Sequence, residues 1–397
     1  MRAYHASDEE SLLARSLLKD WAGEGFLSES QHKQMERETV CELRRTNIFL
    51  RLVLFFFALI IVGAAVGLFF LLFLERSSQQ TIGLFLLAFA AVSYVAAELA
   101  TSKARLYRYG IEEALLVCCV GFVCVGMYFT LSSGSFLFTS ERNAAEFLAA
   151  VAGSILSLWI WHRFGLPYFF LGAMIFAVWL PSYWTSSDAT RHVAVAALYA
   201  AALLTVMIVR PRHRFTFLIQ QYSIAEALLW FGIYLAINLQ LSDSKLSGRA
   251  TTEFARPFYW TTWTLIWCLP PLVLARGLRL KDRFVIVAGA IVAILTLITN
   301  KSYLGGERHT WDPMLLGAFL IVVALVIRRW LASGLNEIRH GFTARRLSGK
   351  DKVWLNTAAT ALGLAAPNAI VPSPQAASPD AQFGGGDSGG GGASSEW

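Results

Sequence analysis

The sequence has little charge for its length. Only 15% of its 397 residues are charged and 56% are hydrophobic, whereas soluble domains carry about 25% charged residues. The mean hydropathy is +0.51. This composition excludes an ordinary soluble domain and predicts a multi-pass membrane protein. The net charge of +7 does not indicate nucleic acid binding, because most lysines and arginines lie in short loops beside apolar runs, as membrane topology requires.

The sequence also lacks the spacings of metal and nucleotide sites. Its seven histidines show no His-x-x-x-His or HExxH pattern, and it contains no P-loop or dinucleotide fingerprint. Its cysteines form no Cys-x-x-Cys pair, and we interpret them as small apolar fillers; they are Cys41, Cys118, Cys119, Cys124 and Cys268. We therefore expect no metal, no cofactor and no enzyme activity.

One short string imitates a catalytic motif. Gly386-Asp387-Ser388-Gly389-Gly390 spells the residues around the nucleophile of chymotrypsin-type proteases. That chemistry requires a serine on a rigid scaffold with a histidine and an aspartate converging on it. Here the serine lies in a glycine run, so we reject a catalytic role.

The strongest positive signal is the uncharged run at residues 52–74, which follows Arg44, Arg45 and Arg51. As a helix it reaches roughly 34 Å, enough to cross a hydrocarbon core of about 30 Å. We interpret it as a retained signal-anchor. Nine further spans are predicted at 80–99, 112–131, 145–161, 164–184, 192–209, 221–241, 257–275, 284–300 and 313–331. The predicted fold is an all-α bundle of about ten spans over residues 48–331.

Residues 1–47 predict a small helical hairpin. Ser7 and Ser28 begin two capping boxes, and Gly23 and Gly25 end the first helix. Leu13, Leu17 and Trp21 form one apolar face at four-residue spacing, and we expect the second helix to run unbroken into the first span. The hairpin is too short for a core of its own, so we expect it to pack on the rest of the protein or on a partner.

Charge distribution predicts that both termini are cytoplasmic. With the N-terminus inside, the cytoplasmic ends of the spans carry more lysine and arginine than the opposite ends. The cytoplasmic set is Lys103, Arg105, Arg108, Arg163, Arg210, Arg212, Arg214, Arg276, Arg279, Lys281 and Arg283.

The region after the last span is expected to contact the membrane surface and partners. Residues 332–350 predict an amphipathic helix on an anionic leaflet, with Leu335, Ile338 and Phe342 on its apolar face. Residues 351–397 are rich in glycine and proline and predict a flexible tail; its apolar stretch at 353–366 is too short to span comfortably. Phe383 and Trp397 are its candidate partner-binding residues.

Ionisable residues inside spans indicate where a membrane protein works. Glu98, Glu112, Glu113 and Glu146 fall at span ends, where ion pairs need no special function, and only Glu226 is clearly inside a span. Tyr222, Glu226, Trp230, Tyr234 and Asn238 form a slanting polar stripe on the seventh span. The stripe either lines a cavity or joins helices by hydrogen bonds. No charged residue falls at a predicted midplane, which argues against a proton- or sodium-coupled pump.

The eighth predicted span contains Trp267 followed by Pro270 and Pro271. Two prolines either break the helix, so that freed carbonyls line a site, or make a kink that neighbouring helices absorb. Small residues at four-residue spacing indicate close helix packing within the chain or between copies; the pairs are Gly63 and Gly67, Ala149 and Gly153, and Gly289 and Ala293.

Two segments of the sequence resemble known bacterial membrane proteins. LLKDWAGEGFLSESQ, two apolar spans and RLYRYGIEEALLVCCVGFVCVG resemble bacterial membrane proteins of the domain of unknown function 2157 type, over roughly residues 9–131. This resemblance implies a bacterial inner-membrane location and carries no established activity. The tail GGGDSGGGGASSEW is similar to Gly/Ser tails ending in Trp on bacterial membrane proteins, including ones with TPM-type domains, and implies tethering or recognition.

Two functions remain open from the sequence. The first is a structural or regulatory membrane protein that binds a partner. The second is a transporter or channel for a small or amphipathic substrate, with a cavity at Tyr222, Glu226, Trp230, Tyr234, Trp267, Pro270 and Pro271.

Overall fold

The computed structural model describes residues 2–4, 6–23, 26–39, 43–44, 46–74, 76–132, 142–185, 187–213, 218–242, 255–304, 311–334, 338–339 and 342–343. Every structural statement below refers to these residues. Phe383 and Trp397, the stretch 353–366 and the Gly386–Gly390 string all lie outside them.

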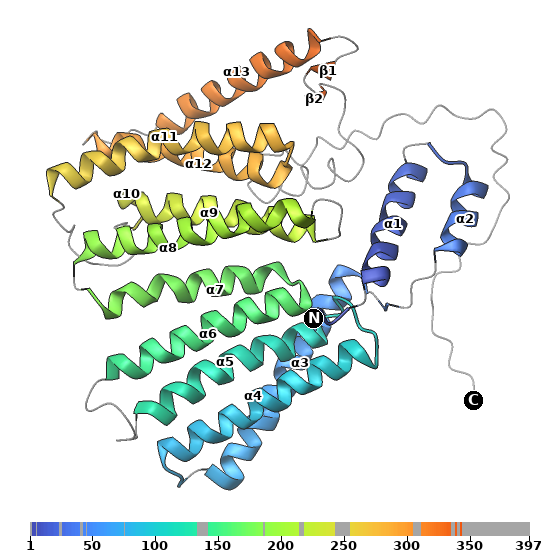
Figure 1. Cartoon of the computed structure of the whole chain (residues 1–397), viewed down its shortest axis with the longest axis vertical. Helices are drawn as coiled ribbons and strands as arrows, with labels where there is room; N and C mark the ends of the chain where they lie inside the picture. Colours follow the sequence, from blue (N-terminus) through green and yellow to red (C-terminus); the bar gives the residue numbers. More distant parts are fainter. Residues whose placement is uncertain are drawn as a thin grey trace. The chain divides into compact units, whose positions relative to one another are not determined.

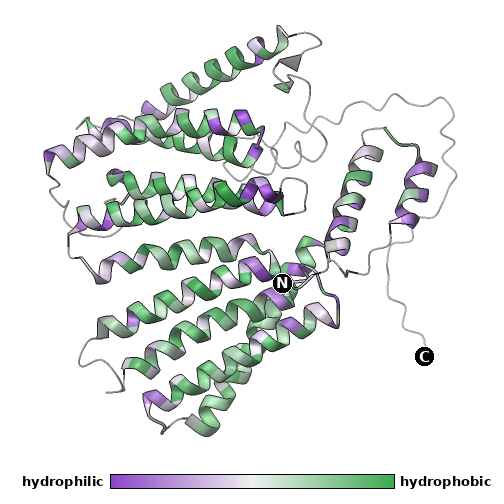
Figure 2. Ribbon diagram, in the orientation of Figure 1, coloured by the Kyte–Doolittle hydropathy of each residue, from purple (hydrophilic) through white to green (hydrophobic). Residues whose placement is uncertain are grey.

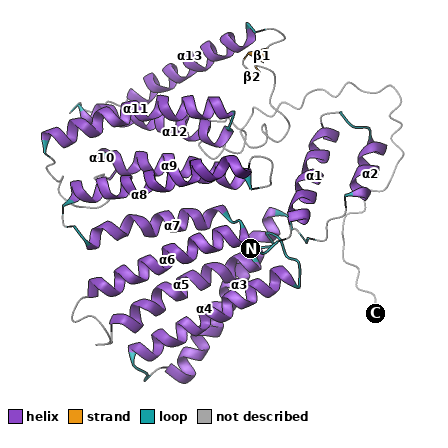
Figure 3. Ribbon diagram, in the orientation of Figure 1, coloured by secondary structure: helices purple, strands orange, loops and turns teal. Residues whose placement is uncertain are grey.

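The described chain is almost entirely helical (Figure 3). The first half contains α1 (Ala6–Gly23), α2 (Glu29–Glu38), α3 (Ile48–Phe69) with η1 (Phe70–Leu74), α4 (Gln79–Ser102), α5 (Ile111–Ser132), α6 (Arg142–Phe164) and α7 (Pro167–Trp179) with η2 (Leu180–Tyr183). The second half contains α8 (Asp188–Val209), η3 (Arg210–His213), α9 (Ile219–Ile237), α10 (Leu239–Ser242), α11 (Arg256–Leu280), α12 (Arg283–Tyr303) and α13 (Asp312–Ala332).

The predicted all-α transmembrane bundle is confirmed. Each of the ten predicted ranges holds a helix, and eight of these helices are long and apolar enough to cross a membrane. The other two are the shorter α7 with η2, and α9. The first half of α9 contains the polar residues Gln220, Gln221 and Glu226. Figure 2 shows hydrophobic residues along the helices and hydrophilic ones gathered toward their ends.

From α4 to α12, successive spans pack side by side and run in alternating directions (Figure 1). In one part, α4 packs on α5, α5 on α6 and α6 on α7, around Ala97, Leu116 and Ile160. In the other part, α8 packs on α9, and α12 packs on both α9 and α11, around Tyr199, Leu229 and Val285. This alternation brings the predicted cytoplasmic ends together at one end of the bundle.

Two of the three small-residue motifs pack helices within the chain. A Cβ at Gly153 would lie 2.6 Å from the Cys124 sulfur, and one at Gly289 would lie 2.9 Å from the Leu274 side chain. A side chain at either position would therefore collide with a neighbouring helix. Gly63 and Gly67 differ, since a Cβ at either would meet nothing within 4 Å. The α3 motif therefore packs against no other described part of the chain.

The prediction that α2 continues into the first span is wrong. The α2 helix ends at Glu38, where the Thr39 hydroxyl donates to the Met35 carbonyl (2.8 Å). Farther on, Arg44 pairs as an isolated parallel bridge with Leu106. This bridge requires extended backbone at Arg44, which a continuous helix would not allow. Its partner Leu106 lies in a loop more than sixty residues later in the sequence. The α3 helix then begins at Ile48. The predicted capping box of Ser28 and Gln31 is confirmed.

The predicted amphipathic helix at 332–350 is also wrong where the structure describes it. The second compact unit, Val326–Trp397, contains strands β1 (Ile338–Arg339) and β2 (Phe342–Thr343), which pair antiparallel with Ile338 opposite Thr343. The sequence accounts for this in part, because Gly334 and Gly341 each disfavour a helix by about 1 kcal/mol.

Candidate functional site

Glu226 lies in a buried cluster of charges at one end of the bundle. Its side chain is 0% exposed. One carboxylate oxygen accepts from Arg276 Nε of α11 (3.0 Å), and the other pairs with Arg210 of η3. Arg210 also pairs with Asp282, which lies in the turn between α11 and α12. The two arginines balance the two carboxylates, so this cluster is a neutral clamp across η3, α9, α11 and α12.

Two of the residues predicted to line a cavity here are enclosed by other described residues. Glu226 and Tyr234 are both fully buried, so neither lines a space that water reaches. Tyr222 stacks on His213 and packs edge-on against Trp161, and Trp230 belongs to the apolar core. The alternative interpretation of the polar stripe, hydrogen bonds between helices, is confirmed at its far end. There the hydroxyl oxygen of Tyr234 accepts from Asn238 Nδ2 (2.8 Å) and lies 3.1 Å from the Thr296 hydroxyl.

The two prolines of the eighth predicted span do not break it. Helix α11 is continuous through Pro270 and Pro271. Because Pro270 has no N–H, it leaves the carbonyl of Ile266 without its helical donor. The Thr296 hydroxyl of α12 donates to that carbonyl (3.1 Å), so a neighbouring helix absorbs the defect. The indole N–H of Trp267, the next residue of α11, donates to Asn300 one turn farther along α12 (3.1 Å).

Two further ion pairs lie at the same end of the bundle. Arg51 of α3 contacts both carboxylate oxygens of Glu113, with one Nε–Oε2 distance of 2.9 Å. Arg163 of α6 pairs with Glu98 of α4. In the sequence these glutamates lie near the cations Lys103, Arg105 and Arg108. The partners instead come from other helices, so these pairs join α3 to α5 and α4 to α6.

The N-terminal segment is anchored at this end. The backbone N–H of Ala3 donates to the Arg163 carbonyl (2.9 Å), and the ring of Tyr4 packs edge-on against Tyr107 at 4.9 Å. Arg2 pairs with Glu9 at 2.9 Å. Gly165, at φ +71°, closes the α6–α7 turn beneath Arg2, where any side chain would collide with it. The start of the chain is therefore seated on the ends of the spans.

Burial shifts the pKa of two ionisable groups in this anchor. Burial raises the pKa of the Tyr4 hydroxyl, which remains protonated at any physiological pH. Burial also raises the pKa of Glu9 above the ordinary carboxyl value, although the positive charges of Arg2 and Arg108 act in the opposite direction. Glu9 is therefore the group in this anchor whose charge depends on pH in the acidic range.

The far side of the hairpin is anchored to the same loop. The Arg44 N–H donates to the Arg105 carbonyl (2.9 Å), and the Tyr107 N–H donates to the Arg44 carbonyl (3.0 Å). Within the hairpin, Arg15 Nε donates to the Thr39 carbonyl (2.8 Å) and joins α1 to α2. Tyr107 thus holds both the beginning and the end of the hairpin.

Between these two anchors the hairpin exposes large apolar side chains. Leu17 and Trp21, from the predicted apolar face, are 41% and 47% exposed, and Phe26 is 73% exposed. Leu18 is buried. The predicted face therefore exists, and none of its exposed members is covered by another described part of the chain.

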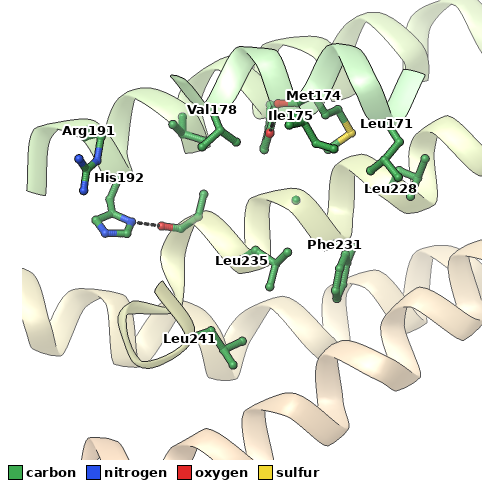
Figure 4. Close-up of a pocket in the computed structure, with 14 residues that line it drawn as sticks. Leu171, Met174, Ile175, Val178, Arg191, His192, Leu228, Phe231, Leu235 and Leu241 are labelled. Atoms are coloured by element: carbon green, nitrogen blue, oxygen red, sulfur yellow. Dashed lines mark hydrogen bonds between the residues drawn. The ribbon is translucent and has the colours of Figure 1, made fainter. Parts of the chain in front are cut away.

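A separate apolar cavity of about 370 Å³ lies among α7, α8 and α9 (Figure 4). We call it the α7–α9 groove; its lining is Leu171, Met174, Ile175, Val178, Arg191, His192, Val195, Tyr199, Leu228, Phe231, Gly232, Leu235, Ala236 and Leu241. In Figure 4, Arg191 and His192 lie at one end of the group, and Leu171 and Leu228 at the other. None of the seven cavity residues predicted from the sequence lines this groove.

The sequence therefore missed the clamp partners, the Tyr4 anchor and the groove. Asp282 had a detectable signal, because it directly precedes α12 and its side chain accepts from the Phe284 N–H (2.9 Å), as helix-capping aspartates do. Tyr4 and the groove residues had none, since their roles depend on distant contacts. The described residues contain no group of histidine, cysteine and carboxylate side chains suited to a metal ion.

Comparisons with protein-family models, with curated proteins and with solved structures each gave no match to this chain.

Proposed function

We propose that this chain is a structural or regulatory membrane protein that binds a protein partner through its N-terminal hairpin. One observation carries the proposal. The hairpin is fixed to the bundle at Ala3–Tyr4 and at Arg44, yet Leu17, Trp21 and Phe26 between these anchors remain exposed. Exposed aromatic side chains on a rigidly held element are typical of the centre of a protein interface.

The location is part of the same proposal. The chain resides in a bacterial inner membrane with both termini in the cytoplasm, so the hairpin faces cytoplasmic partners. The support is the gathering of Arg51, Arg163 and Arg210 at one end of the bundle, since positive residues favour the cytoplasmic side. Reporter fusions after Ser244 and Ser348 are expected to report outside and inside, respectively, and the opposite pattern overturns the orientation.

The C-terminal tail is proposed as a second contact for the partner, through Phe383 and Trp397. The basic region after the last span would hold the start of this tail near anionic lipid. Deleting residues 383–397 should weaken partner capture, whereas Glu226→Ala should leave capture unchanged in whatever protein remains folded. The reverse result would favour transport over partner binding.

Site-specific photo-crosslinking in living cells tests the hairpin directly. A photoreactive phenylalanine analogue at Trp21 or Phe26 should give one discrete protein adduct. The same analogue at Gln34, an exposed polar position on α2, should give much less. Adducts only with lipid, or equal adducts at all three positions, would overturn the proposal.

The alternative, transport of a small or amphipathic substrate through a cavity at Glu226, has less support. Glu226 is enclosed by Arg210 and Arg276, and Trp267 lies on a different part of α11. The apolar groove is the remaining feature that favours an amphipathic ligand.

A further inference from the structure

The α7–α9 groove has an apolar floor, although Tyr199 and His192 lie in it and Arg191 lies at one end. The Tyr199 hydroxyl donates to the Met174 carbonyl (2.7 Å), and His192 Nδ1 hydrogen bonds to the Ala236 carbonyl (2.7 Å). Both of these atoms already form hydrogen bonds with backbone carbonyls. A ligand that needs hydrogen bonds from the floor would therefore find few there, whereas an aliphatic chain needs none.

The helices behind the groove pack closely at Gly232, which has no side chain. A Cβ at this position would lie 2.5 Å from the Met174 methyl and 3.0 Å from the Tyr199 ring. Helices α7, α8 and α9 therefore approach closely behind the groove. Its volume of about 370 Å³ falls within the usual range of ligand pockets, about 300–1,000 Å³.

The rim of the groove exposes apolar side chains of α7 and α9. Leu171, Ile175 and Val178 on α7 are 42%, 54% and 43% exposed, and Leu235 on α9 is 39% exposed. Such side chains in the middle of a span contact hydrocarbon. The groove is therefore open sideways to the bilayer.

The length of the groove matches one leaflet. From His192 to Tyr199 on α8, and from Leu228 to Ala236 on α9, the lining covers roughly 10–12 Å of helix. Half of a hydrocarbon core of about 30 Å is about 15 Å. An acyl chain standing in one leaflet would fill the groove from end to end.

One end of the groove carries an ion pair. Arg191 lies in the first turns of α8, where the span meets the membrane surface, and Asp188 holds its guanidinium at 2.7 Å. An arginine has five N–H donors, so this pairing leaves others for a second anion such as a phosphate. The charged end and the apolar groove have the same order as the headgroup and chain of a phospholipid.

We propose that the α7–α9 groove binds one acyl chain of a bilayer phospholipid, with its phosphate at Arg191. The site is distinct from the hairpin surface proposed above, and neither proposal depends on the other. A bound chain would bridge α7 to α8 and α9, and so stabilise the junction between the two packed parts of the bundle.

Photolabelling of the full chain in vesicles tests this proposal. The vesicles contain phosphatidylethanolamine and phosphatidylglycerol, with a trace of phospholipid that carries a diazirine on one acyl chain. Labelling should concentrate on the peptides that contain Ile175 and Leu235. Ile175→Trp should fill the groove and lower this labelling by about tenfold, which corresponds to about 1.4 kcal/mol of lost binding.

Leu204→Trp is the matched control, because Leu204 is on α8, is 60% exposed and does not line the groove. It should leave labelling unchanged. Uniform labelling of all lipid-facing helices, or unchanged labelling in Ile175→Trp, would show only general lipid contact and would overturn the proposal. Crosslinks from the groove to a second copy of the chain would overturn it as well.

A second variant tests the headgroup contact independently of the acyl-chain contact. It also serves if Ile175→Trp does not fold. Arg191 lies at the end of the groove, so Arg191→Gln should not disturb the core. This variant should retain less phospholipid after purification than the wild type, as measured by native mass spectrometry. Unchanged retention would overturn the phosphate contact. The wild-type protein can also be exchanged into detergent and into phospholipid in separate samples. If it then retains detergent and no phospholipid, the assignment of the ligand is overturned.

Discussion

Tyr4 and Tyr107 pack edge to face, with their ring centroids 4.9 Å apart, where the N-terminal segment meets the loop between α4 and α5. The backbone of Tyr107 also donates to Arg44. One loop residue therefore fixes both ends of the hairpin that carries the proposed partner surface.

Removing the Tyr4 hydroxyl should strengthen the anchor. This hydroxyl is buried and has no hydrogen-bond partner among the described residues, and such a group costs about 1–3 kcal/mol. Tyr4→Phe retains the ring contact and should slow exchange of the Ala3 amide hydrogen. Tyr4→Ala loses the ring and should speed that exchange. Faster exchange in Tyr4→Phe would mean that the hydroxyl has a stabilising partner.

The anchor should become more stable as pH falls. Because the pKa of Glu9 is higher in the folded protein than in the unfolded chain, the folded state binds the proton more tightly. Ionised Glu9 therefore weakens folding at neutral pH, and this penalty disappears as pH falls through the raised pKa toward the ordinary value of 4.5.

Glu9→Gln provides the control for this pH effect, since glutamine does not titrate in this range. The thermal unfolding midpoint of the wild type, minus that of Glu9→Gln, should increase from neutral to mildly acidic pH. A difference that stays constant would show that Glu9 has an ordinary pKa in the folded protein.

Breaking the buried clamp should destabilise the bundle strongly. Arg210→Ala leaves Glu226 and Asp282 buried with less compensation, and losing one partner of a buried ion pair typically costs about 3–5 kcal/mol. Lys33→Ala is the control, because its pair with Glu29 is exposed and within one helix, and such pairs contribute about 0.3–0.5 kcal/mol. Denaturant unfolding in detergent measures both. Equal effects would contradict the clamp.

The small-residue motifs should differ in their tolerance of larger side chains. Gly153→Leu forces a side chain against Cys124 and Phe176, and overpacking of this kind typically costs about 1–3 kcal/mol. Gly63→Leu meets open space and should leave the unfolding midpoint of the monomer unchanged. If Gly63→Leu instead lowers the oligomeric state on size-exclusion chromatography, α3 joins copies of the chain.

Part of this structure was predictable because it depends on local sequence. The hydropathy pattern located a helix in each of the ten predicted spans, because a span must be apolar along its own length whichever helices lie beside it. The capping box at Ser28 and the close packing at Gly153 were predictable for the same reason. The helical prediction for 332–350 was wrong at Ile338–Arg339 and Phe342–Thr343, because its apolar spacing was also compatible with a short strand pair.

The sequence by itself determined that this is a helical membrane protein, which segments form its spans and which ends carry positive charge. Only the tertiary structure decided that Arg210 joins Glu226 to Asp282, that Thr296 satisfies the carbonyl freed by Pro270, and that Tyr107 anchors the hairpin. The physical reason is that apolar helix surfaces are nearly equivalent in lipid, so hydropathy does not specify which helices become neighbours. The polar partners, and the groove among α7, α8 and α9, follow from that choice.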